Sequence, residues 1–317
     1  MQNRLIVSTS PHLRGDDNTS KIMWAVCFAL LPSGIASVAI FGISALKVIV
    51  ASVLSCVITE AAVQKMTKRK VSVSDGSAFL TGLLLAYNLS SSVPLWLPVV
   101  GGMFAIIICK QFFGGLGKNI FNPALAARAF LLASWPKHMT SFVKPFDIDA
   151  VTSATPLAML KEAKVDSFSQ LGLSYLDLFI GNRGGCLGEV CIIALLIGAA
   201  YLLWKGYIWW HTPASFISTV ALLSFLFSPQ GFMKGDILFS IISGGLILGA
   251  FFMATDYVTT PLTSKGQLIF GFGCGVITFI IRRFGGYPEG VSYSILIMNA
   301  AVPLIDRYVR PRIYGVK

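Results

Sequence analysis

Charged residues are scarce in this chain: Asp, Glu, Lys and Arg make up only 12% of its 317 residues. Soluble domains typically carry about 25% charged residues, so the composition excludes an ordinary soluble protein. Hydrophobic residues make up 55%, and the uncharged stretch 22–46 exceeds the ~20 apolar residues that cross a bilayer as a helix. The sequence therefore predicts an all-α polytopic membrane protein.

Histidine is rare and cysteine is unpaired along the chain. The three histidines, His12, His138 and His211, show no ligand spacing, so the sequence predicts no metal site. The six cysteines form no C-x-x-C pair, which argues against an iron–sulfur cluster held by this chain alone. Cys186 and Cys191 lie close together in the sequence, so a disulfide between them is an open alternative.

No apolar run precedes residue 22, so the sequence predicts no cleavable signal peptide. Ten membrane spans are expected, at 22–43, 47–64, 76–92, 94–112, 121–135, 189–205, 208–228, 236–254, 267–283 and 290–306. This divides the chain into an N-terminal segment 1–21, a first five-helix repeat 22–135, a loop 136–188, a second five-helix repeat 189–306 and a tail 307–317.

Basic residues predict the orientation in the membrane. The strongest cluster, Lys65, Lys68, Arg69 and Lys70, follows the second span and is expected to be cytoplasmic. Counting spans from it places both termini in the cytoplasm and the loop 136–188 outside. Much of the net charge of +11 lies at cytoplasmic span ends, where it favours anionic lipid, so we expect no nucleic-acid partner.

An internal repeat relates the two halves. Gly82 and Gly249 head similar runs, and the prolines Pro94 and Pro261 that follow are separated by the same interval, 249 − 82 = 261 − 94 = 167. Because each half has an odd number of spans, the second half is expected to enter the membrane inverted. The polar runs 88–94 and 255–261 occupy corresponding places, and they predict either broken helices around a midplane site or short interfacial loops.

The loop 136–188 contains the segment most suggestive of chemistry. Asp149 precedes Thr155 by six residues. The side chains of Thr152, Ser153 and Ala154 between them are small, and Pro156 after Thr155 keeps the backbone extended. We expect this arrangement to expose the Thr155 hydroxyl. The pattern resembles the acceptor site at which a flavin transferase esterifies FMN through its phosphate onto threonine, although Ser, Thr and Pro are also common in ordinary loops.

Ionisable residues within or beside spans are costly, by roughly 2.5–3.5 kcal/mol at the bilayer centre on insertion scales, and so invite a functional interpretation. Arg128 lies toward the middle of a predicted span, where a carboxylate, a flavin or a phosphate would offset the cost. Four acidic residues lie near span ends, where solvation is the alternative explanation. The chief candidates among them are Asp256 and Asp306, followed by Asp75 and Glu60.

Two sequence blocks give the chain a family resemblance. The first comprises residues 114–119, 121–124 and 128–130, and the second comprises 252–256, 260–261, 265–266, 287–290 and 298–300. Together they resemble the D subunit of the Rnf ion-translocating oxidoreductase complex and, more distantly, the B subunit of the sodium-translocating NADH:quinone reductase. The likeness runs from about residue 12 to residue 314, and the short N-terminal segment favours the Rnf branch.

This resemblance implies covalent FMN on Thr155, with Asp149, Thr152, Ser153, Ala154, Pro156 and Arg128 around the cofactor; Ser153 stands where the family often has glycine. It implies electron relay from the FMN-bearing G subunit toward the NAD-linked C subunit, in a complex that also contains the A, B and E subunits. Sodium or proton translocation would be coupled to it, with Asp75, Thr255, Asp256 and Asp306 as candidates for the ion path or for a second, noncovalent flavin such as riboflavin. The expected location is the bacterial inner membrane.

Two other functions compete with a flavoprotein. Inverted five-helix repeats with broken helices also describe channels or transporters for small neutral solutes, and a structural scaffold for redox partners would have the same fold without flavin. The segment from Asp149 to Pro156 discriminates between these classes, because a channel or scaffold has no use for it.

Overall fold

The structure, a computed structural model, describes residues 17–69, 71–143, 145, 152–153, 155–162, 174–228, 231–287 and 289–310. Helices dominate these residues, and the strands form only two short antiparallel pairs. Asp149 and Ala154 lie outside the described residues, and only the backbone of Thr152 and Ser153 is described. Three of the helices, α1, α2 and α13, are long and apolar enough to cross a membrane.

The first half contains five helical segments in the places that the sequence predicts. They are α1 (Thr19–Phe41), α2 (Ile43–Met66), α3 (Ser77–Tyr87), α4 (Trp96–Ile106) extended by the π-helix η2 (Ile107–Gln111), and α5 (Pro123–Ser134), with the 3-10 turn η1 (Val73–Asp75) before α3. Local sequence determines where they begin and end. Asn18 caps α1 by accepting a hydrogen bond from Lys21 N, and Gly42 ends it at a positive φ of 68°.

The second half repeats this order. It contains α9 (Ile192–Trp204), α10 (His211–Leu226), α11 (Ile237–Ile242), α12 (Leu246–Leu248) with the π-helix η4 (Gly249–Met253), α13 (Ser264–Phe284) and α14 (Val291–Tyr308). The predicted span 236–254 is broken in the structure into α11 and the α12–η4 segment. Ser243 adopts an extended conformation and Gly244 a positive φ of 70°, so the span breaks between α11 and α12.

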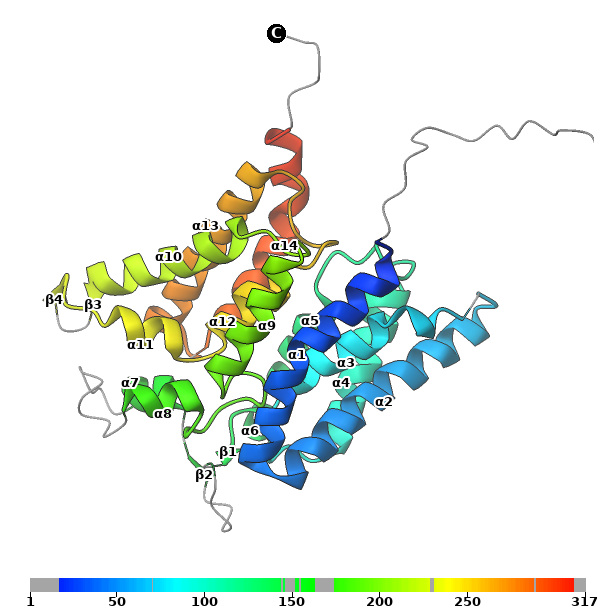
Figure 1. Cartoon of the computed structure of the whole chain (residues 1–317), viewed down its shortest axis with the longest axis horizontal. Helices are drawn as coiled ribbons and strands as arrows, with labels where there is room; N and C mark the ends of the chain where they lie inside the picture. Colours follow the sequence, from blue (N-terminus) through cyan, green and yellow to red (C-terminus); the bar gives the residue numbers. More distant parts are fainter. Residues whose placement is uncertain are drawn as a thin grey trace, which may run out of the picture.

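The segment between the halves carries short elements. These are α6 (Pro136–Met139), β1 (Phe142–Val143), β2 (Thr152–Ser153), α7 (Pro156–Glu162) and α8 (Tyr175–Ile180), and a second strand pair, β3 (Phe227–Ser228) with β4 (Gly231–Phe232), follows α10. In Figure 1, β2, α7 and α8 lie on the side opposite to the start of α1 and the end of α14. We call these two sides the α7 side and the terminal side.

The two halves are inverted with respect to each other. The start of α1 lies beside the end of α9, where Tyr207 Oη donates to Asp17 Oδ1 at 3.3 Å. Farther along, Ser33 Oγ donates to Gly188 O at 3.1 Å, just before α9 begins. These corresponding helices therefore run antiparallel, and α5 and α14 do the same, because Arg128 contacts Ser292 while Asn122 lies beside Asn299.

The polar runs 88–94 and 255–261 lie in non-helical segments that follow α3 and η4, and contacts with other parts of the chain hold them. α3 ends at Tyr87, and the chain after it contributes Tyr87 O and Leu89 O as acceptors for Gly188 N and Leu187 N, each at 2.9 Å. η4 ends at Met253, whose carbonyl accepts from Asn122 Nδ2 at 3.4 Å. Neighbouring segments thus pair polar groups of this non-helical backbone, which is the condition for irregular backbone inside a membrane protein.

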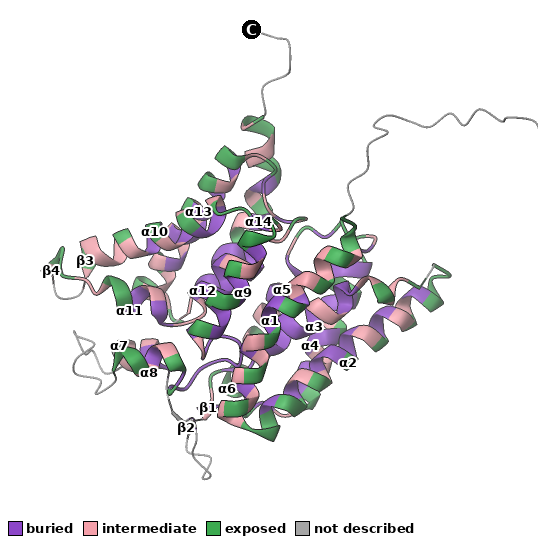
Figure 2. Ribbon diagram, in the orientation of Figure 1, coloured by how far each residue is buried: buried purple, intermediate pink, exposed green. Residues whose placement is uncertain are grey.

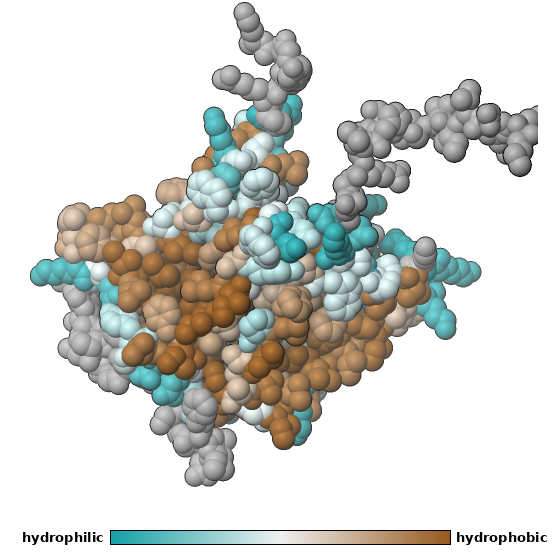
Figure 3. Space-filling model, in the orientation of Figure 1, coloured by the Kyte–Doolittle hydropathy of each residue, from teal (hydrophilic) through white to brown (hydrophobic). Residues whose placement is uncertain are grey.

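Burial and hydropathy place the core between the halves. Buried residues are densest in α3, where nine of eleven residues are buried, whereas α1, α2 and α9 mix buried with exposed positions (Figure 2). Figure 3 shows a broad hydrophobic surface across the middle of the molecule, with hydrophilic residues above and below it. Large apolar side chains such as Phe28 and Ile58 are each 62% exposed, as expected of a protein that faces lipid.

Candidate functional site

Thr155 lies at the start of α7 and is buried. Its side chain is only 3% exposed, so the expectation of an exposed hydroxyl was wrong. The physical reason is local, because Thr155 Oγ1 accepts from Ala158 N at 3.3 Å and Thr155 O accepts from Met159 N at 2.9 Å. These contacts make Thr155 the cap of α7, with Pro156 in the first helical position.

Helix α7 docks on the second half of the molecule. Lys161 Nζ donates to Tyr287 O at 3.1 Å and also to Gly285 O, both in the turn between α13 and α14. Burial lowers the pKa of Lys161 below its ordinary value. On the same side, a Cβ added to Gly244 would meet Leu157 Cδ1 at 2.8 Å, Arg282 Nη2 at 3.2 Å and Glu289 Cγ at 3.7 Å. The helix that Thr155 caps therefore lies near charged residues of the second half.

These charged residues belong to a largely buried group that we call the seam cluster: Arg128, Arg183, Cys186, Glu189, Arg282 and Glu289. Arg128 on α5 pairs with Glu289 at 2.5 Å, and the two side chains are 11% and 10% exposed. Arg128 Nη2 also lies 3.8 Å from Cys186 Sγ. The partner that the sequence analysis required for Arg128 is thus a carboxylate from the opposite half.

The rest of the seam cluster comes from the turn before α9 and from α13. Arg183 Nη2 donates to Glu189 O at 2.9 Å, and Glu189 Oε1 accepts from Cys186 N at 3.0 Å. Arg282 Nη1 and Nη2 donate to Ser240 O at 2.7 Å and Ser243 O at 3.0 Å, which caps the broken end of α11. Cys186 is a free thiol in this structure, as is Cys191, so no disulfide joins them.

Several polar atoms of the seam cluster lack a hydrogen-bond partner among the described residues. The unpaired donors are Arg128 Nε, Arg183 Nη1 and Arg282 Nε, and the unpaired acceptor is Glu289 Oε1. Buried polar groups are normally paired, so an unpaired group marks a place for water or a ligand. Three arginines against two glutamates give the cluster a formal charge of +1, which favours an anionic ligand over a metal cation.

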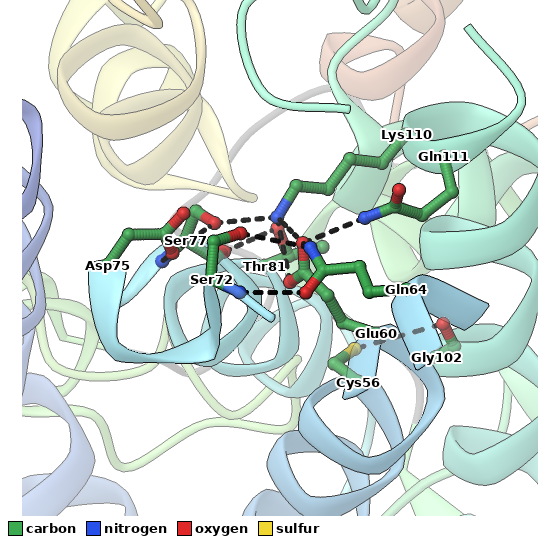
Figure 4. A network of polar contacts seen from close by, with 10 residues as sticks. All are labelled: Cys56, Glu60, Gln64, Ser72, Asp75, Ser77, Thr81, Gly102, Lys110 and Gln111. Atoms are coloured by element: carbon green, nitrogen blue, oxygen red, sulfur yellow. Dashed lines mark hydrogen bonds and ion pairs between the residues drawn. The ribbon is translucent and has the colours of Figure 1, made fainter. Parts of the chain in front are cut away.

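A second polar network lies on the first half, around Lys110 (Figure 4). Lys110, in the π-helix η2, pairs with Glu60 at 2.8 Å, and the two side chains are 3% and 1% exposed. Gln64 and Gln111 also donate to Glu60, and Lys110 Nζ donates to Ser77 Oγ at 2.6 Å. Ser77 in turn donates to Asp75 Oδ1 at 2.6 Å. Glu60 is therefore a buried ion-pair partner, and the solvated alternative was wrong for this residue.

A cavity between the halves gathers some of the predicted ion-path residues. Thr255 and Asp256 line it from the second half, and Ser77, Lys110 and Asn122 line it from the first. Asp256 is half-buried, and burial raises its pKa above the ordinary value of an aspartate.

Asp75 and Asp306 are held to one side of this cavity. Asp75 reaches the lining only through Ser77. Asp306 Oδ1 accepts from Leu262 N at 3.2 Å, in the segment that follows Asp256.

The structure thus separates the predicted site residues into two groups. Arg128 belongs to the seam cluster and Thr155 and Pro156 belong to the nearby α7, whereas Thr255 and Asp256 line the cavity between the halves. The sequence analysis missed Arg183, Glu189, Glu289 and Lys110 as members of these groups. Lys110 alone had a usable signal, because it is an ionisable residue inside an apolar run.

Comparison with known proteins gives full-length similarities. The chain matches the sequence model of the NQR2, RnfD, RnfE family over residues 6–315. It is 52% identical over 314 residues to the D subunit of the Na(+)-translocating ferredoxin:NAD(+) oxidoreductase complex of Acetobacterium woodii, covering 98% of this chain and 96% of that protein. It is 46% identical over 323 residues to the D subunit of the Proton-translocating ferredoxin:NAD(+) oxidoreductase complex of Clostridium ljungdahlii, covering 100% of this chain and 98% of that protein.

A more distant relative shares the same extent. The D subunit of the Ion-translocating oxidoreductase complex of Salmonella paratyphi B is 38% identical over 346 residues, with 98% of each chain covered.

Proposed function

We propose a function from the premise that this chain belongs to the NQR2, RnfD, RnfE family. It is the membrane-embedded D subunit of an ion-translocating ferredoxin:NAD oxidoreductase, and it relays electrons through FMN bound covalently to Thr155. The observation that carries this proposal is the similarity to such D subunits along almost the entire chain. A solute channel is disfavoured by the same observation, since these relatives are named as oxidoreductase subunits.

The residues around Thr155 suit a group that bears a phosphate. A phosphodiester and a reduced flavin are both anionic, and the helix that Thr155 caps packs beside Arg282 in a cluster with a net positive charge. Unpaired guanidinium donors in this cluster offer hydrogen bonds that an anion accepts. Arg128, Arg183 and Arg282 are the residues we expect to hold the negative charge of the cofactor.

The flavin and the protein chain have separate roles in this arrangement. The flavin, when bound, supplies the redox chemistry by accepting and releasing single electrons. The chain supplies its position through α7, whose Lys161 anchors it to the α13–α14 turn, and it supplies a largely buried positive environment through the seam cluster. The electron donor we propose is the FMN-bearing G subunit on the external face, in a complex that also contains the A, B, C and E subunits.

Translocation of a cation belongs to the proposed function as well. The two relatives from Acetobacterium woodii and Clostridium ljungdahlii are named for different ions, so similarity alone does not choose between sodium and protons for this chain. We propose Asp256 and Thr255 as residues of the ion path, with Asp75 and Asp306 beside them, because the first two line the cavity between the halves. The same cavity is where we propose that a second, noncovalent flavin would bind.

The test of covalent attachment is in-gel ultraviolet fluorescence of the denatured polypeptide. A phosphoester-linked flavin survives denaturation, whereas a noncovalent one is lost. We expect Thr155→Val, which keeps the side-chain shape without the hydroxyl, to insert in the membrane and to lose all fluorescence. Ser153→Ala is the matched control and should remain fluorescent. Fluorescence that persists in Thr155→Val would show that the flavin is attached elsewhere, and a non-fluorescent parental chain would support the scaffold alternative.

A further inference from the structure

The seam cluster is more elaborate than the docking of α7 requires. Lys161 alone reaches two carbonyls of the second half, and Leu157 packs at Gly244. The cluster nevertheless brings three guanidinium groups and two carboxylates together from three parts of the chain. The Sγ atom of Cys186 and one carboxylate oxygen from each of Glu189 and Glu289 lie within 4.8 Å of one another. Removing this many charges from water is costly, so their retention calls for an explanation beyond packing.

The charges of the seam cluster are not balanced. Each carboxylate has contacts inside the cluster, since Glu289 pairs with Arg128 and Glu189 accepts from the Cys186 backbone. The guanidinium groups of Arg183 and Arg282 bond only neutral backbone carbonyls. Among the described residues the cluster therefore carries a net formal charge of +1, and Arg282 is a member that lies near the helix that Thr155 caps.

An uncompensated charge in a buried site acts over a longer range than one in water, because the effective dielectric constant there is lower. A flavin gains negative charge when it is reduced. The phosphate and the ribityl chain put the ring at some distance from Thr155, but the cluster charge needs no direct contact to stabilise a charge on the ring.

We propose that the seam cluster stabilises the negative charge that the flavin on Thr155 gains on reduction and so sets the midpoint potential of that flavin. This inference rests on the proposed function. Arg282 is the main positioning residue, because it is the guanidinium of the cluster that lies at Gly244, where Leu157 of α7 packs. Glu289 opposes it, since its carboxylate lies next to the same point and reduces the local positive charge.

The proposal predicts shifts of opposite sign for two variants. Arg282→Gln removes positive charge and should lower the midpoint potential of the covalent flavin. Glu289→Gln removes negative charge and should raise it. At an effective dielectric constant of about 20, one charge about 10 Å away changes the ratio of reduced to oxidised flavin by about tenfold. A tenfold change corresponds to about 59 mV for a one-electron couple.

The measurement is spectroelectrochemical titration of the intact complex, with the covalent flavin content checked by in-gel fluorescence. Arg283→Gln is the matched control, because Arg283 is the next residue on α13 and is exposed, so its charge is screened by solvent. Arg282→Lys keeps the charge and should restore the parental potential even where the caps on Ser240 and Ser243 are weakened. A purely structural role for Arg282 predicts that lysine and glutamine have similar effects.

Three results would overturn the inference. Unchanged potentials in both charge variants, with covalent flavin at the parental level, would reject the electrostatic role and leave the proposed function intact. Shifts of the same sign in Arg282→Gln and Glu289→Gln would point to a general disturbance of the seam. A parental chain without covalent flavin would reject the proposed function first, and this inference with it.

Discussion

Lys110 and Glu60 show what a single buried ion pair contributes. Their charged atoms lie 2.8 Å apart and are almost inaccessible to solvent. Lys110→Met leaves the Glu60 carboxylate buried without its partner, and breaking such a pair typically costs about 3–5 kcal/mol. We expect a lower midpoint of thermal unfolding for this variant in detergent. The double variant Lys110→Met with Glu60→Gln should recover most of the loss, and a single variant as stable as the parent would show that the pair is dispensable.

Individual residues were only partly predictable from the sequence. Arg128 was recognised because a charge inside an apolar run is costly wherever the chain folds. Its partner Glu289 is 161 residues away, and no local pattern records such a distance. The burial of Glu60 was not predicted for the same reason, since its counterion Lys110 comes from another helix 50 residues later.

Close helix contact is the main feature at the scale of the elements. Where α9 crosses α1, a Cβ added to Gly198 would lie 2.0 Å from Ala29 O, which is a backbone atom that cannot move aside. Gly198→Ala should therefore destabilise the protein by about 1–3 kcal/mol through overpacking, measured as a lower thermal midpoint in detergent. Gly286→Ala is the control, because nothing lies within 4 Å of the added Cβ, and it should change little. Equal stability of both variants would contradict this crossing.

The helices were predicted well because apolar length is a local property. The span expected at 22–43 corresponds to α1 (Thr19–Phe41), and that expected at 290–306 corresponds to α14 (Val291–Tyr308). The break between α11 and α12 was missed, because Ser243 and Gly244 look like ordinary small residues within an apolar run. Arg282 makes the break tolerable by bonding the freed carbonyls, and this compensation comes from a different helix.

The orientation of the molecule is a prediction at the largest scale. The basic residues that follow α2 predict that the terminal side is cytoplasmic and the α7 side external. A cysteine at Leu176, which is 69% exposed on α8, should react with an impermeant thiol reagent added to intact cells. A cysteine at the exposed Lys205, after α9, should be protected. Labelling at Lys205 with protection at Leu176, measured against the parental chain, would invert the orientation.

The inverted arrangement of the halves was predictable from the repeat, because an odd number of spans per repeat leaves no other choice. The seam cluster was not. It assembles from α5, from the turn before α9 and from the region between α13 and α14, which become neighbours only after the two halves have packed. An alignment of one repeat with the other does not show which residues of the two repeats contact each other.

The burial of Thr155 implies an order of events during biogenesis. A modifying enzyme must reach a hydroxyl that is 3% exposed once α7 is docked. On the proposed function, the flavin would therefore be attached while α7 is still away from the second half, and docking would follow. Maturation would then act as a checkpoint, because a chain that closes before it is modified withdraws its own acceptor from the enzyme.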